Sequence, residues 1–121
     1  MNFLVVDDSK YAREGIGKFL KRLGHTVIAE AEDGYGAIDA FKESQADIVT
    51  LDFEMPHMRG IDAAKAILAL DPKAKIIIIT SIVNKKDIIS ASNFGVKNVL
   101  IKPITLEKLK NAITAIENEN E

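Results

Sequence analysis

Several features are scarce or missing in this sequence of 121 residues, and each absence removes a class of protein. Cysteine is absent, which excludes a disulfide framework and a thiolate metal site and is compatible with the reducing cytoplasm. The 16 basic and 18 acidic side chains nearly balance, so the basic surface that nucleic acid requires is not expected. No apolar run approaches the roughly 20 residues of a membrane span. The N-terminal segment has no basic region before its apolar run, so no signal peptide is expected.

The length and composition fit one globular domain over residues 1–121, with 47% hydrophobic and 28% charged residues. No internal repeat, low-complexity segment or linker rich in Pro, Gly and Ser interrupts the chain. The polar residues 117–121 are expected to form a frayed tail.

Five short apolar runs alternate with longer amphipathic stretches. The runs have the length of strands and are rich in β-branched residues: 3–6, 27–29, 48–51, 76–79 and 99–101. Residues 3–6 and 76–79 are apolar at every position, as expected of strands that are covered on both faces. Residues 26–31 are more mixed, which suits an edge strand.

The stretches between these runs have the periodicity of helices. In each stretch apolar side chains share one face: Ala12, Ile16, Phe19, Leu20 and Leu23; Ala37, Ile38 and Phe41; Ile61, Ala64, Ile67 and Leu68; Ile88, Ile89 and Phe94; and Leu106, Leu109, Ile113 and Ile116. Gly24 and Gly95 are expected to end the first and fourth helices, and Thr105 to cap the start of the fifth. Five successive strand–helix units predict an α/β fold, a parallel sheet with helices on both faces.

Polar side chains follow four of the five strands, at the sheet edge where the functional crevice of such folds lies. Asp7 and Asp8 follow the first strand, Asp52 the third, Thr80 the fourth and Lys102 the fifth. Three close carboxylates repel one another, which raises the pKa of at least one of them unless a counter-charge is present. A hard divalent cation would resolve this repulsion, and Mg²⁺ is the best match among oxygen-preferring metals. The lysine and threonine would offer donors to a phosphate, and a carboxylate beside a metal can act as a nucleophile that forms an acyl phosphate.

Taken in order, these motifs resemble the response-regulator receiver domain, of the stand-alone, chemotaxis CheY-like kind. The resemblance covers residues 2–117 and rests on Val5-Val6-Asp7-Asp8, Thr50-Leu51-Asp52-Phe53-Glu54-Met55-Pro56, Gly60-Ile61-Asp62, Thr80-Ser81 and Ile101-Lys102-Pro103. It implies a flavodoxin-like (βα)5 fold, a doubly wound parallel five-stranded sheet with strand order 2-1-3-4-5.

The resemblance also implies roles at the metal site. Asp52 would accept a phosphoryl group from a phosphohistidine on a histidine kinase or phosphotransfer protein. Asp8 and Asp52 would bind Mg²⁺ directly, Asp7 would bind it through water, and the backbone carbonyl of Glu54 would supply a further oxygen. Glu54 and Ile82 stand at the rim of this pocket and are expected to influence the lifetime of the phosphoryl group.

On the phosphoryl side, the resemblance implies that Lys102 contacts the phosphoryl oxygens and that Thr80 hydrogen-bonds phosphorylated Asp52. The Lys102–Pro103 peptide bond would be cis. The sequence departs from the family at Val99, where a Tyr or Phe usually couples to the threonine, so weaker coupling is expected.

The predicted function is a phosphorylation-activated response regulator of two-component signalling, with no enzymatic activity beyond its own phosphoryl transfer and autodephosphorylation. It is expected to be cytoplasmic, a monomer or weak homodimer, without direct nucleic-acid or membrane partners. A downstream protein is expected to dock on the face built from the fourth helix, fifth strand and fifth helix, residues 84–116, where Lys86 and Lys97 are test positions. A role in motility follows by analogy alone.

Three alternatives remain open. A haloacid-dehalogenase-type Mg²⁺-dependent phosphatase also has a strand-end Asp, a Thr and a Lys, and Glu54 occupies the position of its acid/base residue. Such an enzyme needs a longer chain, however, and the Asp7-Asp8 pair fits it poorly. A flavodoxin-type flavin carrier needs a Ser/Thr/Gly-rich loop after the first strand, where this chain has Asp7-Asp8-Ser9-Lys10. A receiver-like module that never takes phosphate is kept open by Val99.

Overall fold

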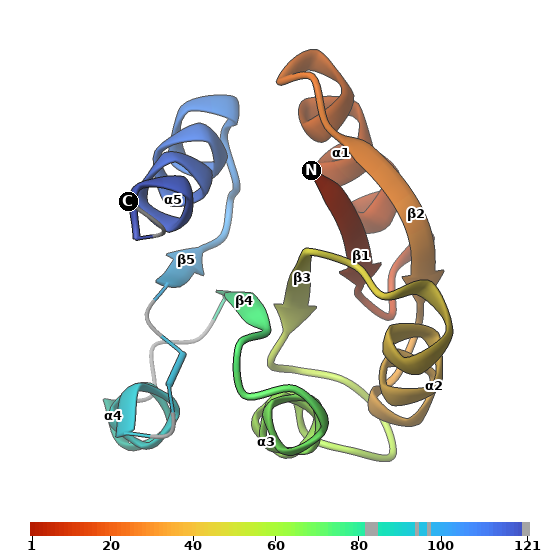
Figure 1. The fold of residues 1–121 in the computed structure, drawn as a ribbon, viewed down its shortest axis with the longest axis vertical. Helices are drawn as coiled ribbons and strands as arrows, with labels where there is room; N and C mark the ends of the chain where they lie inside the picture. The colour runs from red at the N-terminus through yellow and green to blue at the C-terminus, as the bar shows by residue number, and fades with distance from the viewer. Residues whose placement is uncertain (82–84, 94, 97, 120–121) are drawn as a thin grey trace.

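The computed structural model describes residues 1–81, 85–93, 95–96 and 98–119. The expectations for Ile82, Phe94 and Lys97, and for residues 120–121, lie outside this part of the chain. A central sheet with helices on both faces is visible in the ribbon (Figure 1).

Within the described residues, five parallel strands form one sheet in the order β2-β1-β3-β4-β5, which confirms the predicted order. Their bounds are β1 Asn2–Val6, β2 Thr26–Ala31, β3 Ile48–Asp52, β4 Lys75–Thr80 and β5 Asn98–Ile101. The strand β2 lies at an edge, as predicted, and its residues alternate between exposed and half-buried. The central strands β1, β3 and β4 are buried at almost every position, because helices cover both of their faces.

The helices follow the predicted apolar periodicity except in the fourth helix, where Ile89 was expected on the apolar face but is 60% exposed, and Ala91 is buried instead. Their bounds are α1 Lys10–Arg22, α2 Gly34–Ser44, α3 Gly60–Leu70, α4 Lys85–Asn93 and α5 Leu106–Asn118. Gly24 and Gly95 follow α1 and α4 with φ values of 86° and 116°, a region that favours glycine, so both predicted stops are confirmed. Thr105 caps α5 as predicted, since its hydroxyl accepts a hydrogen bond from the Lys108 backbone N–H at 3.1 Å. The helix α5 includes the first two residues of the predicted tail, 117–118.

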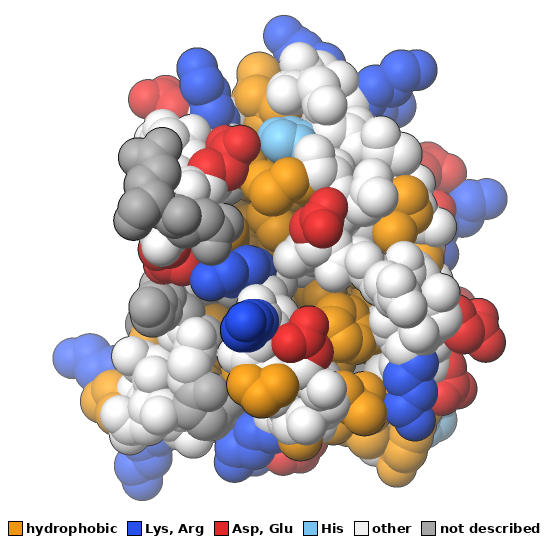
Figure 2. All heavy atoms as spheres, viewed as in Figure 1, with side chains coloured by type: hydrophobic (Ala, Val, Ile, Leu, Met, Phe, Trp, Pro, Cys, Tyr) orange, Lys and Arg blue, Asp and Glu red, His pale blue; other side chains and the backbone are white. Residues whose placement is uncertain are grey.

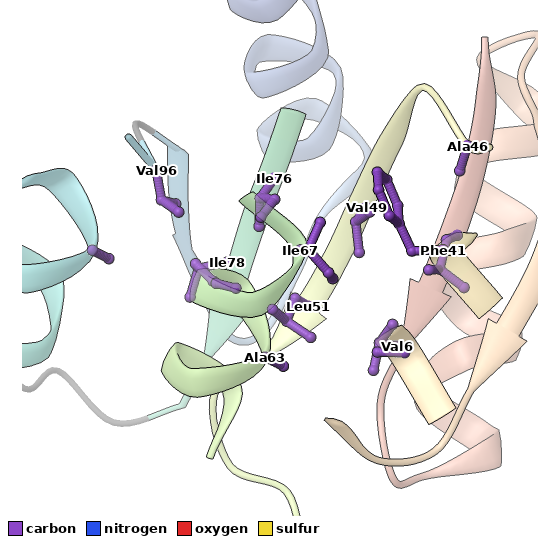
Figure 3. Close-up of a cluster of buried hydrophobic side chains, with 14 residues drawn as sticks. Val6, Phe41, Ala46, Val49, Leu51, Ala63, Ile67, Ile76, Ile78 and Val96 are labelled. Carbon is purple, nitrogen blue, oxygen red and sulfur yellow. The ribbon is translucent and has the colours of Figure 1, made fainter. Parts of the chain in front are cut away.

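Two clusters of buried apolar side chains hold the helices on the sheet. The helices α1 and α5 cover one face through Ile16, Leu20, Leu109 and Ile113, and α2, α3 and α4 cover the other. Figure 3 shows the second cluster, in which strand residues face helix residues; its labelled members are Val6, Phe41, Ala46, Val49, Leu51, Ala63, Ile67, Ile76, Ile78 and Val96. Each fully buried large aliphatic side chain contributes roughly 1.5–3 kcal/mol. This packing fixes the strand order, and with it the edge at which all strand carboxyl ends meet.

Candidate functional site

Three acidic side chains gather at the carboxyl ends of β1 and β3, which are neighbours in the sheet. Asp7 and Asp52 are buried and Asp8 is exposed, and one carboxylate oxygen from each lies within 4.8 Å of the others. The donor set consists of oxygens alone, which suits a hard divalent cation. The structure therefore brings together the three side chains that the sequence predicts as metal ligands.

Asp52 is the last residue of β3, and its carboxylate is almost fully enclosed, with 3% of the residue exposed. Its Oδ1 accepts a hydrogen bond from the Glu54 backbone N–H at 3.0 Å, and its Oδ2 lies 3.5 Å from Lys102 Nζ. Burial raises the pKa of Asp52 from 3.8 to about 6, and the charges of Asp7 and Glu54 act in the same direction. The Glu54 N–H and the Lys102 amine oppose this rise without cancelling it. The pocket is therefore short of positive charge around its central carboxylate.

Lys102 lies between two of the acids. Its Nζ is 3.2 Å from Asp7 Oδ2 and 3.5 Å from Asp52 Oδ2. Burial by itself lowers the pKa of Lys102, but the two carboxylates outweigh this effect, so the net pKa is raised and the amine stays charged. The Lys102–Pro103 peptide bond is cis, as predicted. The amine thus faces the same oxygens that a metal or a phosphoryl group would approach.

Arg13 is a contact of the acidic loop that the sequence motifs did not reveal. Its Nη1 donates to the backbone carbonyl of Asp7 at 2.6 Å, and its Nε donates to Glu30 Oε1 at 3.1 Å. The Asp7 Oδ1 also accepts from the Ser9 backbone N–H at 2.9 Å. These bonds hold the loop between β1 and α1. In the sequence, this contact is indicated only by the position of Arg13, one turn into the helix that follows Asp7 and Asp8.

Thr80 ends β4 with its side chain buried, and its hydroxyl donates to Glu54 Oε1 at 2.6 Å. The neighbouring Ser81 hydroxyl donates to Glu54 Oε2 at 2.8 Å. Glu54 lies at the rim of the pocket as predicted, but its two hydroxyl partners are not evident from the sequence. The bond from Thr80 to phosphorylated Asp52 and the metal contact of the Glu54 carbonyl stay predictions.

Gly60 begins α3 directly against the backbone of Asp52. A Cβ at this position would collide with the Asp52 carbonyl oxygen and would lie 2.5 Å from Phe53 Cα. The Gly60 N–H donates to the Phe53 carbonyl at 3.1 Å. The absence of a side chain therefore lets α3 support the segment that presents the Asp52 carboxylate.

The surface carries charges of both signs. On the face shown in Figure 2, Lys and Arg side chains are interspersed with Asp and Glu, without a continuous basic area. None of the helices within residues 1–81, 85–93, 95–96 and 98–119 combines the length and hydrophobicity needed to traverse a bilayer.

Comparison with known proteins places this geometry in a family. The family model described as "Response regulator receiver domain" matches residues 3–114. The chain is 35% identical over 113 residues to the chemotaxis protein CheY of Thermotoga maritima, covering 93% of this chain and 94% of that protein. It is 36% identical over 115 residues to CheY of Bacillus subtilis, covering 95% and 96%. Among solved structures, the CheX–CheY–BeF3–Mg²⁺ complex from Borrelia burgdorferi matches with a TM-score of 0.93 and 28% identity, over 97% of this chain and 89% of that one.

The family match extends over both the acidic cluster and the Thr80 and Lys102 positions. It gives no support to the haloacid-dehalogenase alternative. The chain therefore belongs to the response regulator receiver domain family, the phosphorylation-activated signalling domains of two-component systems.

Proposed function

We propose that Asp52 is the phosphoacceptor and that its phosphorylation depends on Mg²⁺. The observation that carries this proposal is the enclosed Asp52 carboxylate, which shares its pocket with Asp7 and Asp8 and lies 3.5 Å from the Lys102 amine. A nucleophilic carboxylate needs a neighbouring cation so that an anionic phosphoryl group can approach it. The described part of the chain offers these groups together at the ends of β1, β3 and β5.

In the proposed step, a carboxylate oxygen of Asp52 forms a bond to phosphorus while the bond from phosphorus to a donor histidine nitrogen breaks. The electron pair of the broken bond returns to the imidazole, which takes a proton from solvent. The Lys102 amine is placed to contact the transferred oxygens and to neutralise part of their charge. The product is an acyl phosphate on Asp52, and its hydrolysis would return the carboxylate.

The residues present fit a Mg²⁺ ion, because the acidic cluster offers oxygen ligands alone. Asp8 and Asp52 would hold it directly, Asp7 through water, and Glu54 through its backbone carbonyl. When bound, the ion would supply positive charge to the carboxylates and to the phosphoryl oxygens. The related structure from Borrelia burgdorferi contains Mg²⁺ and BeF3.

We further propose that the protein signals by contact with other proteins and catalyses no reaction beyond its own phosphoryl transfer and autodephosphorylation. The phosphoryl donor would be a histidine kinase or phosphotransfer protein. A downstream protein would dock on the face formed by α4, β5 and α5, where Ile89 is 60% exposed and Lys86 is also exposed. The solved CheX–CheY complex shows that a related protein binds a partner. Because the reported relatives are chemotaxis proteins, motility control is the pathway class that we propose.

Val99 is the residue from which weaker coupling is inferred. It is half-buried and packs against the cluster under α2, α3 and α4. A valine has no ring that could turn between the surface and the interior, so the signal from Thr80 to the docking face would be reduced. The cytoplasmic location and the monomeric or weakly dimeric state stay predictions.

The proposal is tested by incubation with acetyl phosphate, with and without Mg²⁺, followed by measurement of the intact mass. We expect a gain of one phosphoryl group that requires Mg²⁺ and is lost in Asp52→Asn. The variant Asp39→Asn removes an exposed carboxylate on α2 and serves as the matched control. Equal labelling of Asp52→Asn and the wild type would refute the assignment of the acceptor.

A further inference from the structure

The carboxylate of Glu54 binds two hydroxyl groups from the end of β4 at once. Thr80 Oγ1 lies 2.6 Å from Oε1, and Ser81 Oγ lies 2.8 Å from Oε2. These residues are 26 and 27 positions away in the sequence; Thr80 is the last residue of the adjacent strand β4, and Ser81 follows it. Each carboxylate oxygen therefore has its own donor, and the loop after β3 is joined to the segment that leaves β4.

Thr80 can donate its hydroxyl hydrogen to only one acceptor at a time. An ionised carboxylate only accepts hydrogen bonds, and a threonine hydroxyl carries one hydrogen. The hydrogen that Thr80 donates to Glu54 cannot be donated at the same time to a phosphoryl oxygen on Asp52. Glu54 and the phosphoryl group thus compete for the same donor.

The backbone around the contact limits what must move when the hydroxyl is released. The Thr80 carbonyl accepts from the Lys102 N–H at 2.8 Å, which keeps Thr80 in the sheet. The Glu54 N–H donates to Asp52 Oδ1 at 3.0 Å, which ties the competing residue to the acceptor itself. Release of the hydroxyl therefore concerns the Thr80 side chain and not its strand, whereas Ser81 lies beyond the strand.

We propose that Glu54 is a positioning residue that holds the Thr80 and Ser81 hydroxyls in the unphosphorylated protein, and that this hold lowers the affinity of the Asp52 site for a phosphoryl group. The inference rests on the proposed function of Asp52. It assigns Glu54 a role through its side chain that is separate from the metal contact expected of its backbone carbonyl. Phosphorylation would release the Thr80 hydroxyl from Glu54.

The charge of Glu54 and its hydrogen bonds can be separated by three variants. Ser81→Ala removes one of the two donors and keeps the charge. Glu54→Asp keeps the charge but is one methylene shorter, so it cannot serve both hydroxyls. Glu54→Gln removes the charge and keeps the length, and Glu43→Gln, at the exposed carboxyl end of α2, is the matched control for net charge.

The experiment is a titration of each protein with beryllofluoride at saturating Mg²⁺, followed by ¹⁹F NMR and calorimetry, with a separate Mg²⁺ titration. A hydrogen bond to a charged group corresponds to about a tenfold change in an equilibrium constant. We therefore expect Ser81→Ala and Glu54→Asp to bind beryllofluoride about tenfold more tightly than the wild type and Glu43→Gln. For Ser81→Ala the Mg²⁺ affinity should stay near that of the wild type, because no carboxylate is altered.

The outcomes separate the inference from the proposed function. If Ser81→Ala and Glu54→Asp bind beryllofluoride like the wild type, the hold on the hydroxyls is refuted while the Asp52 function stands. If Glu54→Gln alone binds more tightly, charge and not hydrogen bonding is responsible, and the inference again fails. A wild type that takes no beryllofluoride in the presence of Mg²⁺ overturns the proposed function together with the inference. Ser81 is exposed, so its alanine variant tests the hold even if a Glu54 variant does not fold.

Discussion

Replacement of Asp52 by Asn should stabilise the metal-free protein at neutral pH. The buried carboxylate has its pKa raised from 3.8 to about 6, so its charged form is disfavoured in the folded state. A shift of this size corresponds to about 3 kcal/mol as an upper value. Asn keeps the oxygen that accepts from the Glu54 N–H but carries no charge. We therefore expect Asp52→Asn to raise the free energy of unfolding by about 1–3 kcal/mol at pH 7.

The pH dependence has a definite sign. Because the folded pKa lies above the unfolded one, the protonated carboxyl favours folding, and this contribution is complete below pH 3.8. It is lost as the pH rises through about 6. The stability difference between Asp52→Asn and the wild type should therefore be small at pH 4, grow with pH and level off above about pH 7.

The measurement is urea unfolding followed by circular dichroism in EDTA, from pH 4 to pH 7.5. Other carboxylates also titrate in this range, but their contributions cancel largely in the difference between the two proteins. Asp39→Asn controls for net charge and should change the stability by less than about 0.5 kcal/mol. Added Mg²⁺ should stabilise the wild type more than Asp52→Asn, because it binds the folded carboxylates. Equal stability of the two proteins at pH 7 without metal, or a difference that does not change with pH, would refute the reasoning.

Three further predictions concern the support of the site. Gly60→Ala should lower the free energy of unfolding by more than about 2 kcal/mol and weaken Mg²⁺ binding, because its Cβ would displace the Asp52 backbone. A variant that unfolds and binds Mg²⁺ like the wild type would contradict this prediction. Lys102→Met should bind Mg²⁺ more tightly, because the amine that neutralises the carboxylates of Asp7 and Asp52 at 3.2 and 3.5 Å is removed. Weaker Mg²⁺ binding in calorimetry would contradict this prediction. Thr105→Ala should cost about 1 kcal/mol in urea unfolding through loss of the cap on Lys108, whereas Thr105→Ser should retain most of it.

Much of the fold follows from local patterns. The run of residues 76–79 is short, β-branched and apolar at every position, as expected of a strand covered on both faces, so β4 was predictable. The helix ends at Gly24 and Thr105 were predictable for similar reasons, because capping depends on the conformation and side chain of one residue. The strand order came from family resemblance, since periodicity does not say which strands are neighbours.

The candidate site was predictable where residues follow directly from strand ends. Asp7, Asp8 and Asp52 could be placed together because parallel strands end at the same edge and the family resemblance made β1 and β3 neighbours. The bond from Arg13 to the Asp7 carbonyl could not, because it depends on where the first turn of α1 directs a long side chain.

The sequence by itself determined the class of the fold and the kind of chemistry, because apolar periodicity and residue type are local properties of the chain. Only the tertiary structure decided which side chains are close enough to form hydrogen bonds with one another. Glu54 and Thr80 are 26 residues apart, and their contact exists because β3 and β4 are adjacent and end at the same level. The same holds for the raised pKa of Asp52, which comes first from burial in the assembled pocket. Burial and hydrogen-bond choice depend on atoms from several elements, so they are properties of the folded chain.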